Sequence, residues 1–109
     1  MSELTTEDII KLNEAIVLRV AKCLNINTEE RTFTQIFSDI SDSEDSLYEL
    51  VDNLIAIYRQ YQNFHLIIDD KKKRGEQTTD EDTETLMNHM NRRDNARQNL
   101  INALVERNA

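Results

Sequence analysis

The chain has 109 residues with one glycine, no proline and one cysteine, and its formal net charge is −8. This length fits a single domain. The shortage of glycine and proline excludes Gly-rich phosphate loops and most hairpin turns, so neither a dinucleotide-binding fold nor an all-β sandwich is expected. One cysteine excludes a disulfide framework and a thiolate zinc cluster, and the sequence predicts neither cofactor nor metal.

The composition also bounds where the protein works. No apolar run approaches the roughly 18 residues of a membrane span, and the first residues lack the basic start and apolar core of a secretion signal. We therefore expect an intracellular, by default cytoplasmic, protein without membrane contact. The acidic balance disfavours direct binding to nucleic acid, whose phosphates are neutralised by Lys and Arg.

Apolar residues at helical spacing predict a first helix over residues 6–24, with Thr5 or Thr6 as its N-cap and Cys23 in its apolar stripe. A shorter amphipathic helix is expected over residues 29–40, with Thr28 available as its cap. An acidic, capping-rich break follows it, in which Ser43 or Ser41 is expected to cap the next helix.

Two longer helices are predicted over residues 44–73 and 80–107. Gly75 is expected to end the first of them in a left-handed cap, and Thr78 with Glu81 is expected to form a capping box for the second. The short connection predicts an antiparallel hairpin in which the numbers of facing residues sum to about 154. We therefore expect an all-α fold with helix content above about 70%. Its architecture would be a four-helix bundle, with the two shorter N-terminal helices packed on the long hairpin.

The predicted register sets tyrosines of one long helix opposite arginines of the other. Arginine stacks on tyrosine and offers a donor fork to carboxylate or phosphate. This patch is either an anion- or partner-binding site, or a seam whose polar groups satisfy one another and set the register. Its members are Tyr58, Tyr61, Arg92, Arg93 and Arg97.

The acidic excess concentrates in residues 25–53, where eight carboxylates face one arginine. Such a segment can steer a basic protein surface, or can imitate nucleic acid towards a DNA- or RNA-binding protein. The residues expected to contact a partner here are Asp39, Asp42, Glu44, Asp45, Glu49 and Asp52.

Glu49 and Asp52, three residues apart on an apolar helix, resemble half of the magnesium motif of all-α nucleotide pyrophosphohydrolases. The resemblance implies that these carboxylates bind the ion that engages the substrate phosphates. In that family an upstream helix adds a Glu-Glu pair and a third glutamate. Here Glu29 and Glu30 are followed by Phe33 where the third glutamate would stand.

The register also brings His65 towards His89, either as two ordinary interfacial histidines or, with Asp69, as an incomplete metal-ligand set. No nucleophile–base pair, metal cage or phosphate loop is complete. The apolar faces of the long helices exceed what two short helices can cover. We therefore predict a non-catalytic protein–protein interaction module (an adaptor, assembly or regulatory subunit) that is a homodimer or part of a hetero-complex. A metal-dependent pyrophosphohydrolase and an acidic nucleic-acid mimic are the alternatives.

Overall fold

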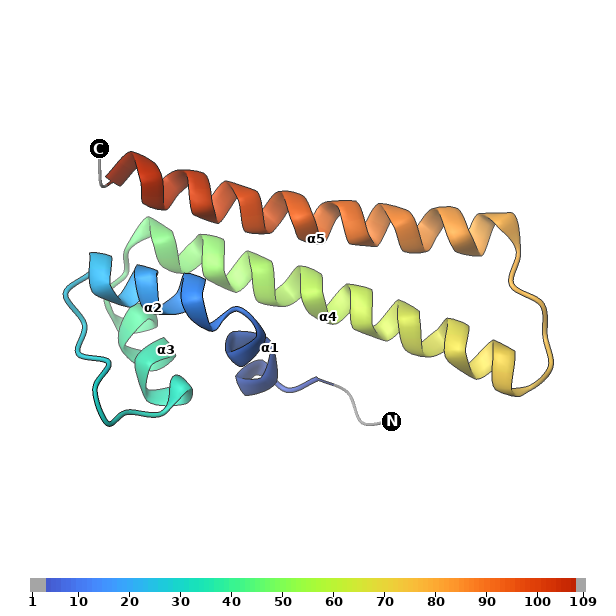
Figure 1. Cartoon of the computed structure of the whole chain (residues 1–109), viewed down its shortest axis with the longest axis horizontal. Coiled ribbons are helices and arrows are strands. Elements are labelled where there is room, and N and C mark those ends of the chain that lie inside the picture. Colours follow the sequence, from blue (N-terminus) through green and yellow to red (C-terminus); the bar gives the residue numbers. More distant parts are fainter. Residues whose placement is uncertain (1–3, 108–109) are drawn as a thin grey trace.

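The computed structural model describes residues 4–107, and all of its regular structure is helical (Figure 1). Helices make up 80% of the structure and no strand occurs among the described residues, which confirms the all-α prediction. There are five helices rather than four. They are α1 (Thr6–Leu12), α2 (Glu14–Cys23), α3 (Phe33–Asp42), α4 (Ser46–Lys73) and α5 (Asp80–Arg107).

The fifth helix arises because the predicted helix 6–24 is broken at Asn13. The Asn13 side chain is 5% exposed and donates a hydrogen bond to the backbone carbonyl of Ile9 at 2.9 Å. Asparagine side chains that bond to nearby backbone compete with the helical ladder, and Asn13 has left helical geometry at φ −110°. The break turns α1 away from the direction of α2 (Figure 1) and buries Ile9 and Ile10.

The second predicted helix starts later and ends later than expected, at Phe33 and Asp42. Its cap is Thr32 and not Thr28, because Thr32 forms a reciprocal capping box with Gln35: the Thr32 hydroxyl accepts from the Gln35 amide at 3.2 Å, and the Gln35 side chain accepts from the Thr32 amide at 3.0 Å. The residues before it form a turn, so the prediction of helix from residue 29 is wrong.

The α4–α5 hairpin follows the predicted ranges closely, although two caps differ. Asp45 caps α4, rather than Ser43 or Ser41, by accepting the Leu47 amide at 3.0 Å. Thr79 caps α5, rather than Thr78, because its hydroxyl and amide bond reciprocally with Asp82 at 3.0 and 3.1 Å. Both caps satisfy amides that a helix leaves without an internal partner.

Gly75 ends α4 as predicted. Its φ of +78° lies in the left-handed region, where glycine is favoured because it has no Cβ. The Glu76 amide donates to the Lys71 carbonyl at 2.9 Å and the Gly75 amide donates to the Lys72 carbonyl at 3.1 Å. This is the Schellman arrangement, and it fixes where the chain turns back.

The three short helices lie at one half of the hairpin (Figure 1): α1 packs against α4, α2 packs against the end of α5, and α3 packs on α1 and α2 and contacts the start of α4 through Phe37 and Tyr48. One core cluster joins them to α4 and α5, and it includes Ile9, Val20, Ile40, Leu54 and Leu100. We call this part, residues 4–58 and 96–107, the base. None of the described helices combines the length and apolar character that a membrane span requires.

The other half of the hairpin, residues 59–95, projects beyond the base, and we call it the arm. Only Ile68 is buried in the arm, and it is not part of the core cluster of the base. The molecule measures 51 × 28 × 19 Å, and its radius of gyration is 16.2 Å, whereas a compact domain of this length has about 13 Å. The short helices therefore cover only the base, and within the described residues the arm consists of α4 and α5 alone.

Candidate functional site

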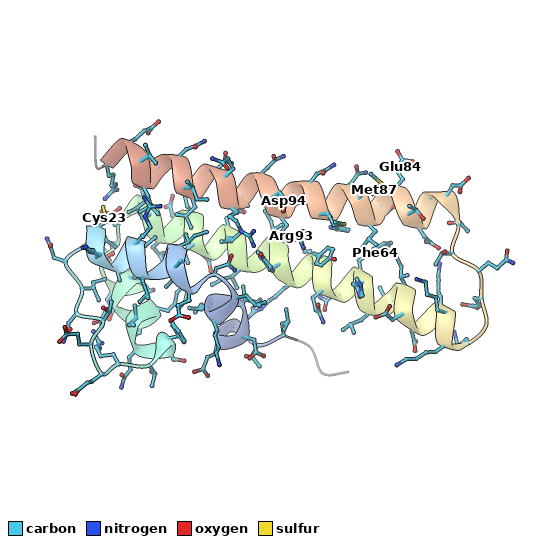
Figure 2. The ribbon with its side chains drawn as sticks, viewed as in Figure 1. Cys23, Phe64, Glu84, Met87, Arg93 and Asp94 are labelled. Carbon is cyan, nitrogen blue, oxygen red and sulfur yellow. The ribbon has the colours of Figure 1, made fainter. Side chains whose placement is uncertain are left out.

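The arm carries apolar side chains that no other element of the described chain covers. Ile67 on α4 is 53% exposed and Met87 on α5 is 57% exposed. Four further apolar residues of the arm are only partly buried: Phe64, which lies between the two helices (Figure 2), and Leu66, Leu86 and Met90. The arm is thus a pair of helices that pack against each other along one side, and the other sides of both helices are exposed to solvent.

At the root of the arm, where it joins the base, the structure brings together four of the five residues of the predicted tyrosine–arginine patch. The Arg93 guanidinium lies 4.7 Å from the ring centre of Tyr61 and 5.7 Å from that of Tyr58. Arg97 stacks on Tyr58 at 5.7 Å and also donates to its hydroxyl. These stacked cations hold the two helices in register. Arg92, the fifth member, is exposed and stands outside the layer.

Beside this layer, α5 meets the α1–α2 break in a concave corner. A cavity of about 230 Å³ there is lined by Leu12, Asn13, Ala15, Ile16 and Arg97. Leu12 is 63% exposed, and the Nε atom of Arg97 is buried without a hydrogen-bond partner. No carboxylate of the described residues pairs with Arg97. The corner therefore adds an unsatisfied donor and an apolar side chain to the root of the arm.

The two histidines do not meet across the seam. His89 stacks on Phe64 with ring centres 5.4 Å apart, so its neighbour on α4 is one residue from the one expected. His65 instead contacts Asp69 on its own helix, with 3.1 Å between Nδ1 and Oδ2. Within residues 4–107, no group of three His, Cys, Asp or Glu side chains is arranged to hold a metal ion.

The acidic residues of the predicted partner surface lie in the base, on α3 and at the start of α4. Two of them are engaged within the fold: Asp39 contacts Arg31 at 2.5 Å, and Asp45 contacts the Arg107 guanidinium at 3.0 Å. The hydrogen bonds from Arg107 and then from the Leu47 amide hold the pKa of Asp45 below its ordinary value. Four acids remain exposed: Asp42, Glu44, Glu49 and Asp52.

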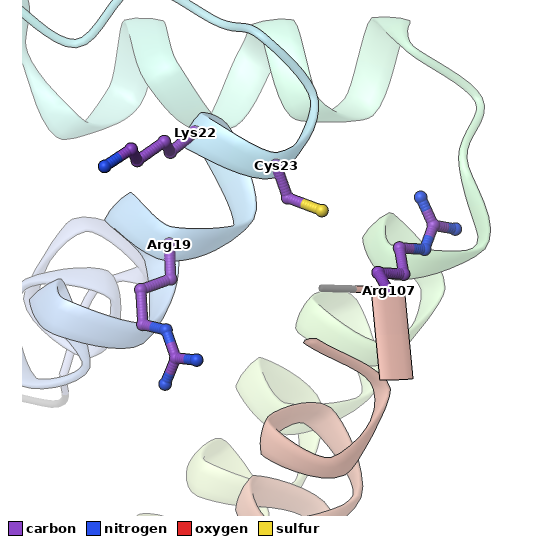
Figure 3. A pocket seen from close by; sticks show the side chains of 4 residues that line it. All are labelled: Arg19, Lys22, Cys23 and Arg107. Atoms are coloured by element: carbon purple, nitrogen blue, oxygen red, sulfur yellow. The ribbon is translucent and has the colours of Figure 1, made fainter. Parts of the chain in front are cut away.

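A second cavity, of about 490 Å³, opens at the far end of the base between α2 and α5 (Figure 3). Arg19, Lys22, Cys23 and Arg107 line it. The thiol is half-buried rather than part of the core. Arg107 is already bound to Asp45, and the carboxyl ends of α2 and α5 carry partial negative charge that offsets the other cations.

No family model, no curated protein and no solved structure matches this chain. Sequence reasoning identified the tyrosine–arginine layer but missed the arm beside it. The signal that could have found it is Ile67, an apolar residue within the predicted helix 44–73 that the structure leaves exposed.

Proposed function

We propose that this protein is a non-catalytic protein–protein interaction module, an adaptor, assembly or regulatory subunit, and that the arm binds its partner. The observation that carries the proposal is that the arm buries only Ile68 while Ile67 and Met87 remain more than half exposed. A hairpin of two helices has one seam, so its other apolar positions stay in water until another element covers them.

The total surface supports the same proposal. The accessible surface is 7183 Å², whereas a compact monomer of 12.8 kDa exposes about 6300 Å². The excess of about 900 Å² fits an elongated molecule whose projecting arm has no further element packed against it. Methionine, aromatic residues and arginine are enriched at protein–protein interfaces, and the arm presents Phe64, Met87, Met90 and Arg92.

The tyrosine–arginine layer fixes the arm in one conformation before a partner binds. Arg93 and Arg97, stacked on Tyr58 and Tyr61, fix the two helices before a partner arrives. A surface that is already ordered loses less conformational entropy on binding than a flexible one. The tyrosine–arginine layer is therefore proposed as the support of the interaction surface, and exposed Arg92 as one of its contacts.

A photo-crosslinking side chain at position 87 tests the proposal, with position 105 as the matched control. Met87 and Val105 are 57% and 55% exposed, and they lie on the same side of α5 because about five helical turns separate them. In an extract of the source cells, the probe at 87 should give one discrete adduct and the probe at 105 none. Equal adducts at both positions, or none at either, contradict the proposal.

The four exposed acids of the base favour a second candidate, an acidic protein that imitates nucleic acid towards a DNA- or RNA-binding target. It requires competition with polynucleotide that weakens steeply as salt rises, and loss of binding when Asp42, Glu44, Glu49 and Asp52 are neutralised together. The pyrophosphohydrolase alternative requires magnesium-dependent release of pyrophosphate that disappears in Glu49→Gln. The described fold brings no third acidic ligand to that pair.

A further inference from the structure

We propose that the corner between the α1–α2 break and α5 is a carboxylate-binding site, and that the partner of the arm places an aspartate or glutamate side chain in it. The acid belongs to a helical segment whose apolar side chains continue along α5 onto Met90 and Met87. The inference rests on the proposed function, because it names the chemistry by which a partner engages the arm. Three observations carry it: the unpaired cation of the corner, its apolar walls, and the face of α5 that leads away from it.

Arg97 is a cation that no carboxylate of the described residues neutralises. Its guanidinium donates to the Tyr58 hydroxyl, and its Nε atom is buried without a hydrogen-bond partner. Asp94, three residues earlier on α5, contacts Arg93 at 3.3 Å instead. A cation that is partly removed from water attracts a carboxylate more strongly than an exposed one does, because less solvent screens the pair. Arg97 therefore has the charge and the donors to bind a carboxylate of another molecule.

The cavity beside Arg97 is mostly apolar. Its volume is about 230 Å³, far more than a single water molecule requires. Besides Arg97 and Asn13 it is lined by Leu12, Ala15 and Ile16, and none of the described acidic residues lines it. Leu12 is 63% exposed, so a hydrocarbon group that enters the corner removes its apolar surface from water. A carboxylate at the end of a short hydrocarbon chain, as in aspartate and glutamate, matches both the cation and the walls.

The charge of the whole chain favours a protein acid over a phosphate-rich partner. The formal net charge is −8, which repels a polyanion such as nucleic acid. A single acidic residue within an apolar segment brings only one negative charge to the corner, and Arg97 neutralises it. A phosphate group also has no hydrocarbon part to pack on the apolar walls. The ligand is therefore an acidic side chain of a protein.

One face of α5 leads from the corner along the arm. Met90 precedes Arg97 by seven residues, so two helical turns bring it to the same face of α5. Met87 lies beside Met90, one turn further towards the tip, and is 57% exposed. Beyond the corner the described arm consists of α4 and α5 alone (Figure 1), so a further helix can lie along this face. Such a helix completes a three-helix bundle, with its acid at the corner and its apolar side chains over the two methionines.

Sodium butyrate tests the site on the full chain, because butyrate reproduces the glutamate side chain from Cα to the carboxylate. In NMR titrations, the Nε–H signal of Arg97 and the methyl signals of Leu12 and Ile16 should shift and saturate in the millimolar range, as expected for a ligand of so few atoms. Butyramide, which has a similar shape and no charge, should bind about tenfold more weakly or less. Inorganic phosphate should also bind more weakly than butyrate. Equal binding by butyramide or by phosphate, or no saturable shift with butyrate, overturns the inference.

Arg97→Gln is the matching variant, because glutamine keeps an amide donor and removes the cation. It should raise the butyrate Kd about tenfold or more, measured at the methyl signals of Leu12 and Ile16. Arg19→Gln, the same change at an exposed arginine of α2 outside this cavity, should leave the Kd unchanged. An unchanged Kd in folded Arg97→Gln overturns the inference. Circular dichroism establishes that both variants are folded, and if Arg97→Gln does not fold, the comparison of butyrate with butyramide in the unaltered protein decides.

The photo-crosslinking probe at position 87 separates this inference from the proposed function. The captured segment should carry an aspartate or glutamate about ten residues from the crosslinked residue, because Met87 and Arg97 are about 15 Å apart along α5. Arg97→Gln should reduce the adduct about tenfold. If the adduct forms equally in that variant, or its segment has no acid at that spacing, the inference is overturned and the proposed function stands. If butyrate binds at Arg97 and the probe captures nothing, the carboxylate site stands and the proposed function is overturned.

Discussion

Two helices of this protein end in a residue with left-handed backbone geometry, which is a glutamate in one case and a glycine in the other. Replacing each residue measures how much a side chain at such a position costs in stability. Glu44 follows the C-cap of α3 at φ +55°, and Gly75 follows that of α4 at φ +78°. A side chain in this region costs about 1 kcal/mol relative to glycine. We predict that Glu44→Gly raises the free energy of unfolding in urea by about 1 kcal/mol and that Gly75→Ala, with nothing within 4 Å of the added Cβ, lowers it by a similar amount.

Glu44→Gln is the control for that experiment, because it removes the charge of Glu44 and keeps the strained backbone. Its free energy of unfolding should stay close to that of the unaltered protein. A stabilisation by glutamine as large as that by glycine would show that the negative charge, and not the left-handed backbone, limits stability at this position.

The hydroxyl of Tyr58 accepts a hydrogen bond from Arg97 at the root of the arm. The Nε atom of Arg97 is buried without a hydrogen-bond partner, so this hydroxyl is an important acceptor for the guanidinium. We predict that Tyr58→Phe lowers the free energy of unfolding by about 1–2 kcal/mol, because a half-buried cation loses its acceptor. Tyr61→Phe is the matched control: Arg93 stacks on the face of that ring, which phenylalanine retains, so the change should be below about 0.5 kcal/mol. Equal losses in the two variants would contradict this assignment.

Single residues are also where prediction from sequence was weakest. Thr28 and Thr32 both stand ahead of the apolar positions of α3, and Thr78 and Thr79 both stand ahead of α5, so the general preference of N-caps for threonine does not decide within either pair. The structure selects the member whose third neighbour reaches back to the cap amide, which is Gln35 for Thr32 and Asp82 for Thr79.

At the scale of elements, a salt bridge closes each end of the hairpin. Asp45 contacts Arg107 at the base, and Asp82 contacts Lys71 at the tip at 3.0 Å. Hydrogen bonds from these cations lower the pKa of both carboxyls below the usual 3.8. A carboxyl with a depressed pKa in the folded state stabilises the fold above its unfolded pKa, and that contribution is lost as the pH falls through the folded value.

Stability should therefore fall as the pH is lowered below about 4, and less steeply in the double variant Asp45→Asn with Asp82→Asn. Urea unfolding between neutral pH and the acid limit of the folded state measures both slopes. Asp42→Asn with Asp80→Asn serves as the control, because these two carboxylates are exposed and form no ion pair within the described chain. A control slope as flat as that of the test variant would contradict the role of the two salt bridges.

The base and the arm should respond differently to loss of apolar contacts. Leu100 is fully buried in the core of the base, and its truncation to alanine should lower the free energy of unfolding by about 3 kcal/mol. Ile68, the one buried residue of the arm, lies in a two-helix seam that water can reach once the side chain is shortened. Ile68→Ala should cost about 1 kcal/mol in the same urea titration, and equal losses would show that the arm and base form one core.

Helix periodicity in the sequence was sufficient to predict both long helices, because their apolar stripes run for many turns. It could not predict the break at Asn13, since one polar residue among apolar ones occurs in many unbroken helices. The break depends on a tertiary contact: only the packed fold decides whether Asn13 bonds the Ile9 carbonyl or remains in solvent.

At the scale of the whole molecule, the sequence indicated more apolar surface than two short helices can cover, but not where the surplus lies. That depends on how far along the hairpin the short helices pack. The structure places all three on the base, so the surplus falls on the arm around Ile67 and Met87. The acidic segment lies in the base, so the two surfaces predicted from sequence are separate (Figure 1).

Hydrogen exchange of the full chain, measured alone and with the protein that the probe at position 87 captures, tests most directly whether the arm is an interaction surface. The account predicts that amides of the arm, residues 59–95, exchange more slowly when that partner is bound. Amides of the base should exchange at the same rates in both samples, since association leaves that core unchanged. Protection that appears in the base and leaves the arm unchanged would contradict the account.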